Sequence, residues 1–429
     1  MAQPNRRFMS QFRITGGKPL RGEITISGRK NAALKLLAAA LLSAEPVTIH
    51  NLPAIGDVAT LVEILNSLGV ESHSDGQSLT LIARDITSTE IPNELGRKLR
   101  ASLVCVGPLL ARTGRASFPH PGGCVIGKRS IEPHLDAFRH LGARIDFDGT
   151  TYHLSTDGLR GSEIYLKEKS VTATENLLMA AVAAEGSTII INAAEETHIT
   201  NLCDFLRSMG YDIHGDGTST ITVHGQPGRL GHGAETTVIS DEIEVGTYAV
   251  AAAVTQGDIL LHKVGTRREL LPILSKLDDF QVLYEYDEGQ QTLHVLPSPT
   301  ITAADVQTNP WPGFPADLQS PFTVLATQAK GTSLVHDWMY EGRLYFVDLL
   351  QKMGATITIC DPHRALVSGP TPLNHSSSIT PDLRAGAALV VAALAAEGTS
   401  VIEHAELIDR GYARIEENLR ALGADITRE

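Results

Sequence analysis

The sequence predicts an α/β protein of two domains, each built from three repeats of about 70 residues. One recurring motif is a helix that ends in an apolar residue and a glycine, followed by a strand. Five copies of the motif contain Gly69, Gly142, Gly210, Gly354 and Gly423, and a degenerate sixth copy has Asp279 in the glycine's place. Glycine suits the left-handed conformation in which many helices end. Such regular repetition along the whole chain predicts a repeat architecture.

A second motif precedes the first in each repeat: an alanine-rich helix, a tight turn and a strand. It is clearest in "AAVAAEGSTIIINAA" and "AALAAEGTSVIEHA". Each repeat therefore reads strand–helix–strand–helix–strand–strand, an alternation typical of α/β layers. Helices this rich in alanine suit close helix–helix contact inside a domain.

The N-terminus supplies strands that the last repeat lacks. The sixth repeat stops at "GADITRE", whereas Phe12–Ser27 shares the pattern of Tyr152–Leu166. We therefore expect a continuous first domain, residues 30–239, and a discontinuous second domain, residues 1–29 and 240–429. The chain would cross between the domains twice, with a cleft at the crossings.

Composition excludes several classes of protein. Of the 429 residues, 42% are hydrophobic and 20% are charged, which supports a large core and argues against disorder. No apolar run reaches the roughly 18–20 residues of a membrane-spanning helix, and residues 1–11 lack the apolar segment of a secretory signal. The net charge of −13 argues against nucleic-acid binding. We expect a soluble, cytoplasmic protein with no membrane or nucleic-acid partner; the oligomeric state is not predicted.

Charged and polar side chains recur where the alanine-rich helices start. These positions hold Lys30, Arg100, Thr174 with Glu175, Asp241, Asp317 and Arg384. Asp241 and Thr174 are residue types that cap helices, whereas a cation at a helix start opposes the helix dipole. The three cations therefore need another partner, either an anionic ligand or a salt-bridged face. We favour an anionic ligand, because helix N-termini also bind anions.

The segment "HPGGCVIGKRSIEPH" predicts a glycine-rich loop around Cys124. Lys128 and Arg129 follow, and neighbouring cations favour the thiolate form of a cysteine. Cys124 is therefore a candidate nucleophile or acid, with an incidental surface thiol as the alternative. The other three cysteines lie in apolar stretches and are expected to be small core residues: Cys105, Cys203 and Cys360. The sequence contains no CxxC pair, so the cysteines do not indicate a disulfide framework or a zinc site.

Two further clusters carry charge: Glu341 with Arg343 after a predicted strand, and Asp409 with Arg410 at a predicted helix start, where Asp409 would be the cap. The sixteen histidines form no HxH or HExxH motif, so we expect them to be surface or core residues. The chain contains no GxxxxGK[ST] or GxGxxG motif, which argues against ATP or dinucleotide binding by such loops.

Five motifs together resemble the UDP-N-acetylglucosamine 1-carboxyvinyltransferase family: "ITISGRKNAAL", "PGGCVIG", "FPADLQ", "PDLRAGAALV" and "IDRGYARIEENLRALGADI". The resemblance spans nearly the whole chain and implies two inside-out α/β domains of three repeats with a cleft between them. It also implies transfer of the enolpyruvyl group of phosphoenolpyruvate to the 3′-hydroxyl of UDP-N-acetylglucosamine, with no metal and no organic cofactor. That reaction is the first committed step of peptidoglycan synthesis, so roles in cell shape and division and sensitivity to fosfomycin are implied as well.

The resemblance also implies roles for individual residues. Lys30, Cys124, Asp317 and Arg410 would be catalytic, with Cys124 protonating C3 of phosphoenolpyruvate and Asp317 acting as base for the sugar hydroxyl. The substrate-binding set would include these residues as well: Asn31, Arg100, Arg129, Ser130, Ile131, Glu132, Pro133, Lys169, Ser170, Val171, Met339, Arg343 and Arg384.

The chain departs from the family pattern where the nucleotide is expected. A usual Arg-Pro-hydrophobic-Asp-Leu-His stretch is Arg129–His134 here, a usual glycine is Thr172, and an expected lysine is Glu168, with Lys169 as a substitute. An arginine often found in the family is Glu242. These changes motivate an alternative acceptor, a different nucleotide or nucleotide sugar. A catalytically silent, UDP-sugar-binding paralogue is disfavoured, because the residues of the catalytic set are present.

Overall fold

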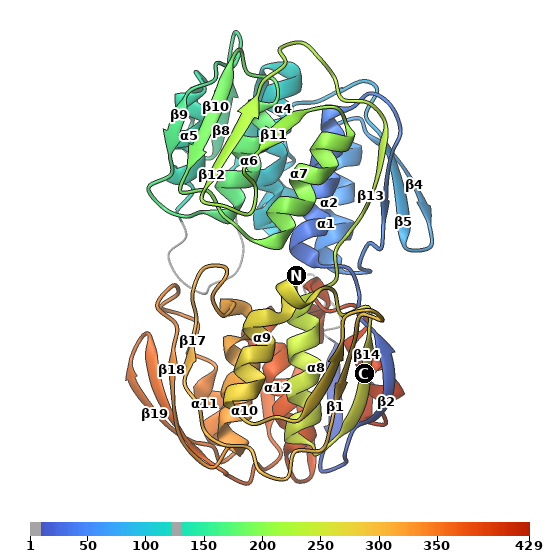
Figure 1. Ribbon diagram of the computed structural model, residues 1–429, viewed down its shortest axis with the longest axis vertical. Coiled ribbons are helices and arrows are strands. Elements are labelled where there is room, and N and C mark those ends of the chain that lie inside the picture. The colour runs from blue at the N-terminus through green and yellow to red at the C-terminus, as the bar shows by residue number, and fades with distance from the viewer. Residues whose placement is uncertain (1–9, 122–129) are drawn as a thin grey trace, which may run out of the picture. The chain divides into compact units, whose positions relative to one another are not determined.

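The computed structural model describes residues 10–121 and 130–429, which form two compact units (Figure 1). The first unit comprises residues 28–121 and 130–239, and the second comprises residues 10–27 and 240–429. The chain passes from the second unit to the first after Ser27 and returns after Ile239. Strands and helices alternate throughout both units, which confirms the predicted α/β class.

The first unit contains three sheets, with strand orders β13-β3-β5-β4, β6-β8-β7 and β11-β12-β10-β9. Its strands are β3 (Val47–His50), β4 (Glu71–Asp75), β5 (Ser78–Ile82), β6 (Arg115–Pro119), β7 (Arg144–Phe147), β8 (Thr151–Ser155), β9 (Glu163–Tyr165), β10 (Ser187–Ile191), β11 (Asp212–His214), β12 (Thr220–His224) and β13 (Ala234–Thr237). Its helices are α1 (Lys30–Ala39), η1 (Ala40–Leu42), α2 (Gly56–Ser67), α3 (Asn93–Lys98), η2 (Arg100–Cys105), α4 (Val106–Thr113), α5 (Glu132–His140), α6 (Val171–Ala181) and α7 (Thr197–Ser208).

The second unit repeats the plan with the sheets β15-β16-β14-β2, β17-β18-β20-β19 and β21-β22-β1-β23. Its strands are β1 (Gln11–Thr15), β2 (Arg21–Thr25), β14 (Asp258–His262), β15 (Tyr284–Asp287), β16 (Thr292–Val295), β17 (Val306–Gln307), β18 (Gly331–His336), β19 (Thr356–Asp361), β20 (Arg364–Gly369), β21 (Ser377–Ile379), β22 (Thr399–Glu403) and β23 (Asp425–Arg428). Its helices are α8 (Glu242–Val254), α9 (Arg267–Asp279), η3 (Ala316–Leu318), α10 (Gln319–Gln328), α11 (Val347–Lys352), α12 (Leu383–Ala395), η4 (Ala405–Arg410) and α13 (Ile415–Ala421).

The last strand of a repeat pairs in parallel with the first strand of another repeat, which links the three repeats of each unit in a ring. In the first unit β9 pairs with β10 and β13 with β3, and a single bridge joins Glu90 to Ser117 of β6. In the second unit β17 pairs with β18, β21 with β22 and β2 with β14. Five of the six sheets therefore include a strand from another part of the chain, and the sheet of the second repeat receives a single bridge.

The N-terminal segment contributes to two repeats. β1 lies between β22 and β23, which confirms that the chain start supplies a strand that the sixth repeat lacks. β2 differs from the expectation, because it joins the sheet of the fourth repeat beside β14. This placement follows from the same exchange of last strands between repeats.

The turn after the second helix of each repeat has a left-handed residue. The five predicted glycines have φ values between 87° and 103°, at Gly69, Gly142, Gly210, Gly354 and Gly423. The predicted sixth position, Asp279, is wrong by two residues. α9 ends at Asp279, and the left-handed residue is Gln281, with a φ of 59°.

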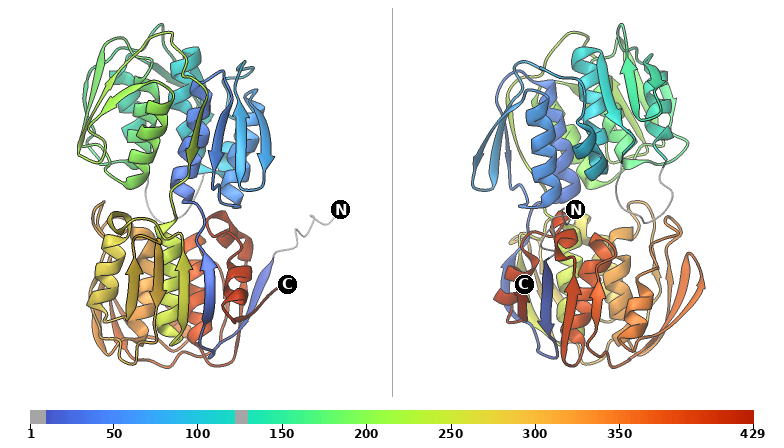
Figure 2. Two further views of the ribbon diagram at one scale, coloured as in Figure 1. Left: turned by 45° about the vertical axis from the view of Figure 1, so that its right-hand side comes forward. Right: turned by 180° about the vertical axis from the view of Figure 1, so that it is seen from behind.

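The alanine-rich helices form the interior of each unit, and the sheets cover them (Figure 2). In α12 every residue from Arg384 to Leu394 is buried, and α8, α10 and α12 contact one another. Small residues permit the closest approaches: a Cβ on Gly107 of α4 would lie 2.3 Å from the backbone oxygen of Asn176 in α6. The strands alternate buried and exposed residues, as expected for sheets with one face in solvent. Helices inside and sheets outside confirm the inside-out arrangement.

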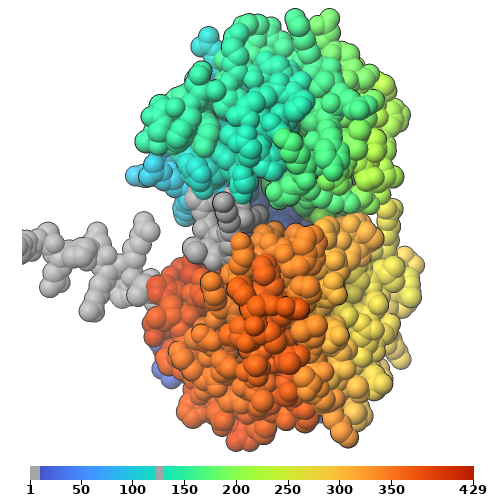
Figure 3. All heavy atoms as spheres, turned by 90° about the vertical axis from the view of Figure 1, so that its left-hand side faces the viewer, coloured from blue at the N-terminus to red at the C-terminus, as the bar shows by residue number. Residues whose placement is uncertain are grey.

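The second helix of each repeat is amphipathic instead. In α9 the buried residues are Leu270, Ile273, Leu274 and Leu277, which follow the spacing of one helix face. Within each unit, side chains fill the spaces between the ribbons on the face drawn in the space-filling view (Figure 3). Within residues 10–121 and 130–429, none of the helices has the length and apolar character needed to cross a membrane.

Candidate active site

Asp317 in the second unit is held by two buried arginines. Its Oδ1 accepts a hydrogen bond from Arg343 Nη2 at 2.8 Å, and its Oδ2 lies 3.1 Å from Nε and 3.0 Å from Nη2 of Arg384. The arginine side chains are 4% and 5% exposed, whereas that of Asp317 is 30% exposed. The carboxylate is therefore the accessible member of the set.

Local structure brings these three side chains together. Arg384 is the second residue of α12, and the N-cap Asp382 accepts hydrogen bonds from its backbone N–H and the next one. Asp317 lies in η3, directly before α10, which packs against α12. Arg343 comes from the segment after β18. A cation at a helix start opposes the dipole, and the carboxylates of Asp317 and Asp382 compensate for that cost.

Both guanidinium groups remain charged despite their burial. Burial by itself lowers the pKa of Arg384, but Asp317, Tyr412 and Asp241 outweigh it and raise the pKa above the usual value. The balance is the same for Arg343, whose pKa is raised mainly by Asp317. The Arg384 guanidinium also lies 5.1 Å from the ring centre of Tyr412, within the range of cation–π attraction.

Arg410 ends η4 in a segment that a second arginine clamps from the last strand. Arg428 of β23 donates to both oxygens of Asp409, at 2.6 and 2.8 Å, and to both oxygens of Glu416, at 2.6 and 3.1 Å. Its guanidinium lies 4.6 Å from the ring centre of Phe12. The capping role predicted for Asp409 is therefore wrong, because its carboxylate is bound to Arg428 and α13 begins at Ile415. The clamp fixes the backbone on both sides of Arg410.

The start of α8 concentrates negative charge. The side chain of Asp241 accepts hydrogen bonds from the backbone N–H groups of Ile243 and Glu244, which confirms Asp241 as a helix cap. Glu242 and Glu244 are both buried. Burial, together with the charge of Asp241, raises the pKa of Glu244 to about 7.

In the first unit, Lys30 and Asn31 are the first two residues of α1. The ammonium group of Lys30 lies 2.7 Å from Asp57 Oδ2, and the two side chains are 14% and 6% exposed. Arg29, the residue before the helix, donates to Thr197 Oγ1 at 3.0 Å. Like Arg384 in the second unit, Lys30 is a cation at the start of an inner helix that a carboxylate compensates.

The predicted nucleotide-binding stretch starts α5. Arg100 Nη2 lies 3.3 Å from the backbone oxygen of Ser130, whose side chain accepts from the backbone N–H of Glu132. Ile131 is buried. Ser130, Glu132 and Pro133 line a pocket of about 250 Å³ between α5 and the end of β9. Its remaining lining residues are Asp136, Ala137, His140, Ile164, Tyr165, Leu166, Lys167 and Glu168.

The second nucleotide-binding stretch precedes α6. Ser170 is the N-cap of α6 and accepts from the backbone N–H of Ala173. Thr174, predicted as a cap, lies four residues further on; its hydroxyl instead donates to the Ser170 carbonyl and accepts from the backbone N–H of Ala194. Lys169 forms an ion pair with Glu195. Thr172 stands where the resembled family usually has glycine, and its Oγ1 lies 3.2 Å from Nε2 of the buried His134.

Beneath these helix starts lies a buried cluster of three ionisable groups from three helices. Glu175 Oε2 lies 3.4 Å from Lys35 Nζ, and Glu175 Oε1 lies 3.3 Å from His198 Nε2. All three side chains are at most 4% exposed, and the Glu175 oxygens accept no well-directed hydrogen bond from the described part of the chain. The short distance to Lys35 favours the carboxylate, but burial outweighs it and raises the pKa of Glu175 to about 8. Burial also lowers the pKa of His198.

The remaining predicted residues fall into two groups. Cys124 and Arg129 lie outside the described residues. Val171 is half-buried at the start of α6, and Met339 is 36% exposed in the segment after β18. Among the other cysteines, Cys105 and Cys203 are buried as expected, but the expectation for Cys360 is wrong, because it is exposed on β19.

Sequence reasoning missed three residues that form ion pairs with the predicted charged side chains. Asp57, Asp337 and Arg428 carry no motif of their own; each is recognised only once the fold places it beside Lys30, Arg343 or Asp409. Asp337 Oδ2 lies 3.9 Å from Arg343 Nε and is fully buried. The available signal was the cation at a helix start, which requires a nearby carboxylate or ligand.

The comparisons with known proteins agree with this arrangement. Residues 14–419 match the family model of EPSP synthase (3-phosphoshikimate 1-carboxyvinyltransferase). The UDP-N-acetylglucosamine 1-carboxyvinyltransferase of Treponema pallidum is 42% identical over 429 residues, covering 98% of this chain and 100% of the relative. The protein of the same name from Paramagnetospirillum magneticum is 43% identical over 432 residues, covering 98% of each chain.

Two solved structures share the fold. The enolpyruvyl transferase NikO from Streptomyces tendae matches with a TM-score of 0.88 at 25% identity, covering 98% of this chain and 99% of its own. The EPSP synthase from Acinetobacter baumannii matches with a TM-score of 0.75 at 19% identity, covering 98% of this chain and 100% of its own.

The buried cluster generates a prediction about pH and stability. The folded state keeps a proton on Glu175 up to about pH 8, whereas the unfolded chain releases it near 4.5. This contribution to stability is fully present below 4.5 and is lost as the pH rises through about 8. Glu175→Gln should therefore lose less free energy of unfolding than the wild type between about pH 5 and about pH 8, measured by urea unfolding.

Glu168→Gln, a change at an exposed residue of the same unit, is the matched control and should follow the wild type. An identical pH dependence in Glu175→Gln and the wild type would contradict the protonated Glu175.

Proposed function

Because the chain belongs to the UDP-N-acetylglucosamine 1-carboxyvinyltransferases, within the EPSP synthase family, we propose that it transfers the enolpyruvyl group of phosphoenolpyruvate to the 3′-hydroxyl of UDP-N-acetylglucosamine and releases phosphate. The observation that carries the proposal is Asp317 between Arg343 and Arg384. The three residues are a carboxylate and two cations. The motif resemblance assigns a catalytic or substrate-binding role to each of their positions. We further propose that the protein acts in the cytoplasm, in peptidoglycan synthesis, and so in cell shape and division.

The reaction proceeds by addition and elimination. The 3′-oxygen attacks C2 of phosphoenolpyruvate and loses its proton to Asp317, while Cys124 supplies a proton to C3. The tetrahedral intermediate then returns a proton from C3 to the Cys124 thiolate and expels phosphate, which restores the C2–C3 double bond in the product. Lys30, Arg129 and Arg410 contact the anionic groups of phosphoenolpyruvate. Fixed cations of this kind stabilise the charge that develops on the phosphate.

The ion pairs of the free protein give Asp317 a second role. An anion that binds Arg343 and Arg384 competes with the Asp317 carboxylate for the same guanidinium groups. Displaced from them, the carboxylate can accept the hydroxyl proton. Lys30 and Asp57 would separate in the same way when phosphoenolpyruvate takes the ammonium group. Substrate binding thus releases the base from its ion pairs with Arg343 and Arg384 only when the anion is in place.

A second candidate differs in its acceptor, and the pocket beside α5 motivates it. Glu132, Asp136 and Glu168 bring three carboxylates to the pocket lining, against Lys167 and His140. Lys169 is already paired with Glu195. Carboxylates near a diphosphate are unfavourable, so a different nucleotide or nucleotide sugar is the alternative acceptor.

The rate of phosphate release distinguishes UDP-N-acetylglucosamine from the alternative acceptor. With phosphoenolpyruvate and a panel of UDP-sugars and nucleosides, UDP-N-acetylglucosamine should give the highest kcat/KM. Glu168→Lys should lower the KM for this acceptor, whereas Lys330→Glu, a change at an exposed residue of the second unit, should leave it unchanged. A higher kcat/KM with another nucleotide would establish the alternative acceptor, and no release with any acceptor would contradict enolpyruvyl transfer.

Fosfomycin, an epoxide that mimics phosphoenolpyruvate, should alkylate Cys124 and inactivate the enzyme, faster in the presence of UDP-N-acetylglucosamine. Burial raises the pKa of Cys105 to about 12 and raises that of Cys203 as well, so both thiols are inert. Cys360 is exposed and serves as the internal control. Cys124→Asp should keep part of the activity, because a carboxylic acid also donates a proton, and should resist inactivation.

Mass spectrometry of the treated protein locates the label. Cys360→Ser should be inactivated like the wild type. A label on Cys360 in place of Cys124 would contradict the role of the glycine-rich loop.

A further inference from the structure

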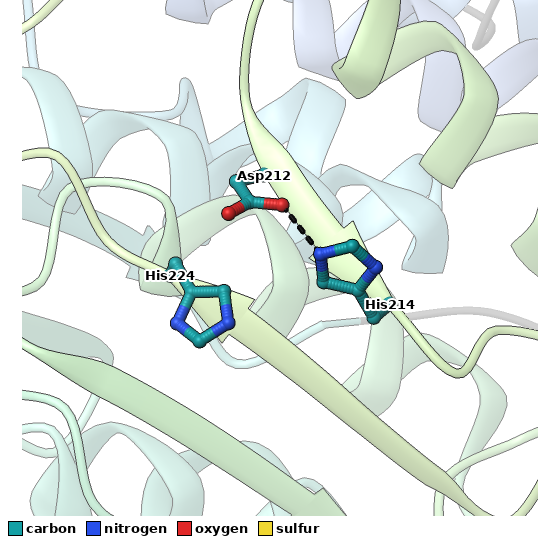
Figure 4. Close-up of side chains that lie close together, drawn as sticks. All are labelled: Asp212, His214 and His224. Carbon is teal, nitrogen blue, oxygen red and sulfur yellow. Dashed lines mark ion pairs between the residues drawn. The ribbon is translucent and has the colours of Figure 1, made fainter.

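A cluster of two histidines and an aspartate lies on the exposed face of the sheet β11-β12-β10-β9 (Figure 4). Asp212 of β11 is paired directly with His224 of β12, and His214 lies two residues along β11 on the same face. One ligand atom from each of the three side chains lies within 4.8 Å of the others. The strand register therefore brings together three side chains that show no metal-binding spacing in the sequence.

The hydrogen bonds of the cluster leave the nitrogen and oxygen atoms that could bind a metal facing one another. His214 Nε2 lies 2.6 Å from Asp212 Oδ1. On the other strand, His224 Nδ1 lies 2.8 Å from Ser187 Oγ of β10, the residue paired with His224 on that side. When Nδ1 donates its proton to Ser187, Nε2 of His224 carries the free lone pair. Hydrogen bonds of this kind to the second ring nitrogen typically orient histidine ligands of metals.

From this geometry we propose that Asp212, His214 and His224 bind a divalent first-row transition metal of the zinc type. Two imidazoles and one carboxylate are donors that zinc accepts, with water in a fourth position. Calcium and magnesium prefer oxygen ligands only and are poor candidates. Zinc ligands at about 2.0–2.1 Å from the metal stand roughly 3.3 Å apart, so side-chain rotations suffice to close the site around an ion.

The site would tie an edge strand to its neighbour. β11 has three residues and lies at the edge of its sheet, where β12 is its one partner strand among the described residues. A metal held by both strands stabilises the folded state, because the unfolded chain does not keep the three ligands together. The site is separate from the residues proposed for enolpyruvyl transfer and does not rest on that function.

The chain contains a matched control in the sheet β6-β8-β7. His153 combines the two kinds of contact: its Nδ1 lies 3.0 Å from Ser117 Oγ, as that of His224 lies near Ser187, and its Nε2 lies 3.1 Å from Asp148 Oδ2, as that of His214 lies near Asp212. Among the described residues, His153 belongs to no group of three potential metal ligands. His153 therefore reproduces the hydrogen bonds of the proposed site without its full ligand set.

Titration calorimetry with zinc chloride on the full chain tests the proposal. The wild type should bind zinc at about pH 7.5, and His214→Gln and His224→Gln should each lower the association constant of that site at least about tenfold. Ser187→Ala should lower it less, and His153→Gln should leave it unchanged. Zinc should raise the melting temperature of the wild type and of His153→Gln, but by less in the two ligand variants.

X-ray absorption of the zinc-loaded protein should show two imidazole ligands. Zinc affinity that is unchanged in both His214→Gln and His224→Gln would overturn the proposal, as would absence of zinc binding by the wild type.

Discussion

The inner helices of both units are buried except at their ends, and this constraint decides where polar chemistry can occur. A helix that packs on all sides offers no exposed face, so its charged side chains must stand at its ends or be paired inside. Alanine and glycine make the packing possible, as at Gly107, where α4 meets the backbone of α6. The exchange of last strands then links the three repeats of each unit, so the helix starts of one unit belong to a single framework.

The candidate site uses those helix starts. Lys30 and Arg384 are cations at positions where the helix dipole disfavours them, and Asp57 and Asp317 compensate. Such pairs hold the cations in place while the protein is free, and they provide carboxylates that a bound anion can displace. The Arg428 clamp has a related effect on Arg410, because it fixes the segment on both sides of that residue. Charge compensation within the free protein and binding of an anionic substrate are thus two uses of the same groups.

Much of the fold could be predicted from the sequence, because glycine turns and alanine-rich helices repeat visibly. The errors arose where tertiary contacts override local pattern: Gln281 takes a left-handed conformation without being glycine, and β2 joins a different repeat from β1. For the site, the sequence identified the cations but not Asp57 or Arg428, because their roles depend on contacts between distant segments. The same reason hid the Asp212–His214–His224 cluster, which strand register alone assembles.

Binding of phosphoenolpyruvate to Asp317→Asn, measured by titration calorimetry, tests the central claim that Asp317 and the substrate anion compete for Arg343 and Arg384. The isosteric change removes the competing charge, so the variant should bind phosphoenolpyruvate severalfold more tightly than the wild type while losing kcat. Asp361→Asn, which removes a half-buried carboxylate paired with Arg364, should bind like the wild type. Weaker binding to Asp317→Asn than to the wild type would contradict the account.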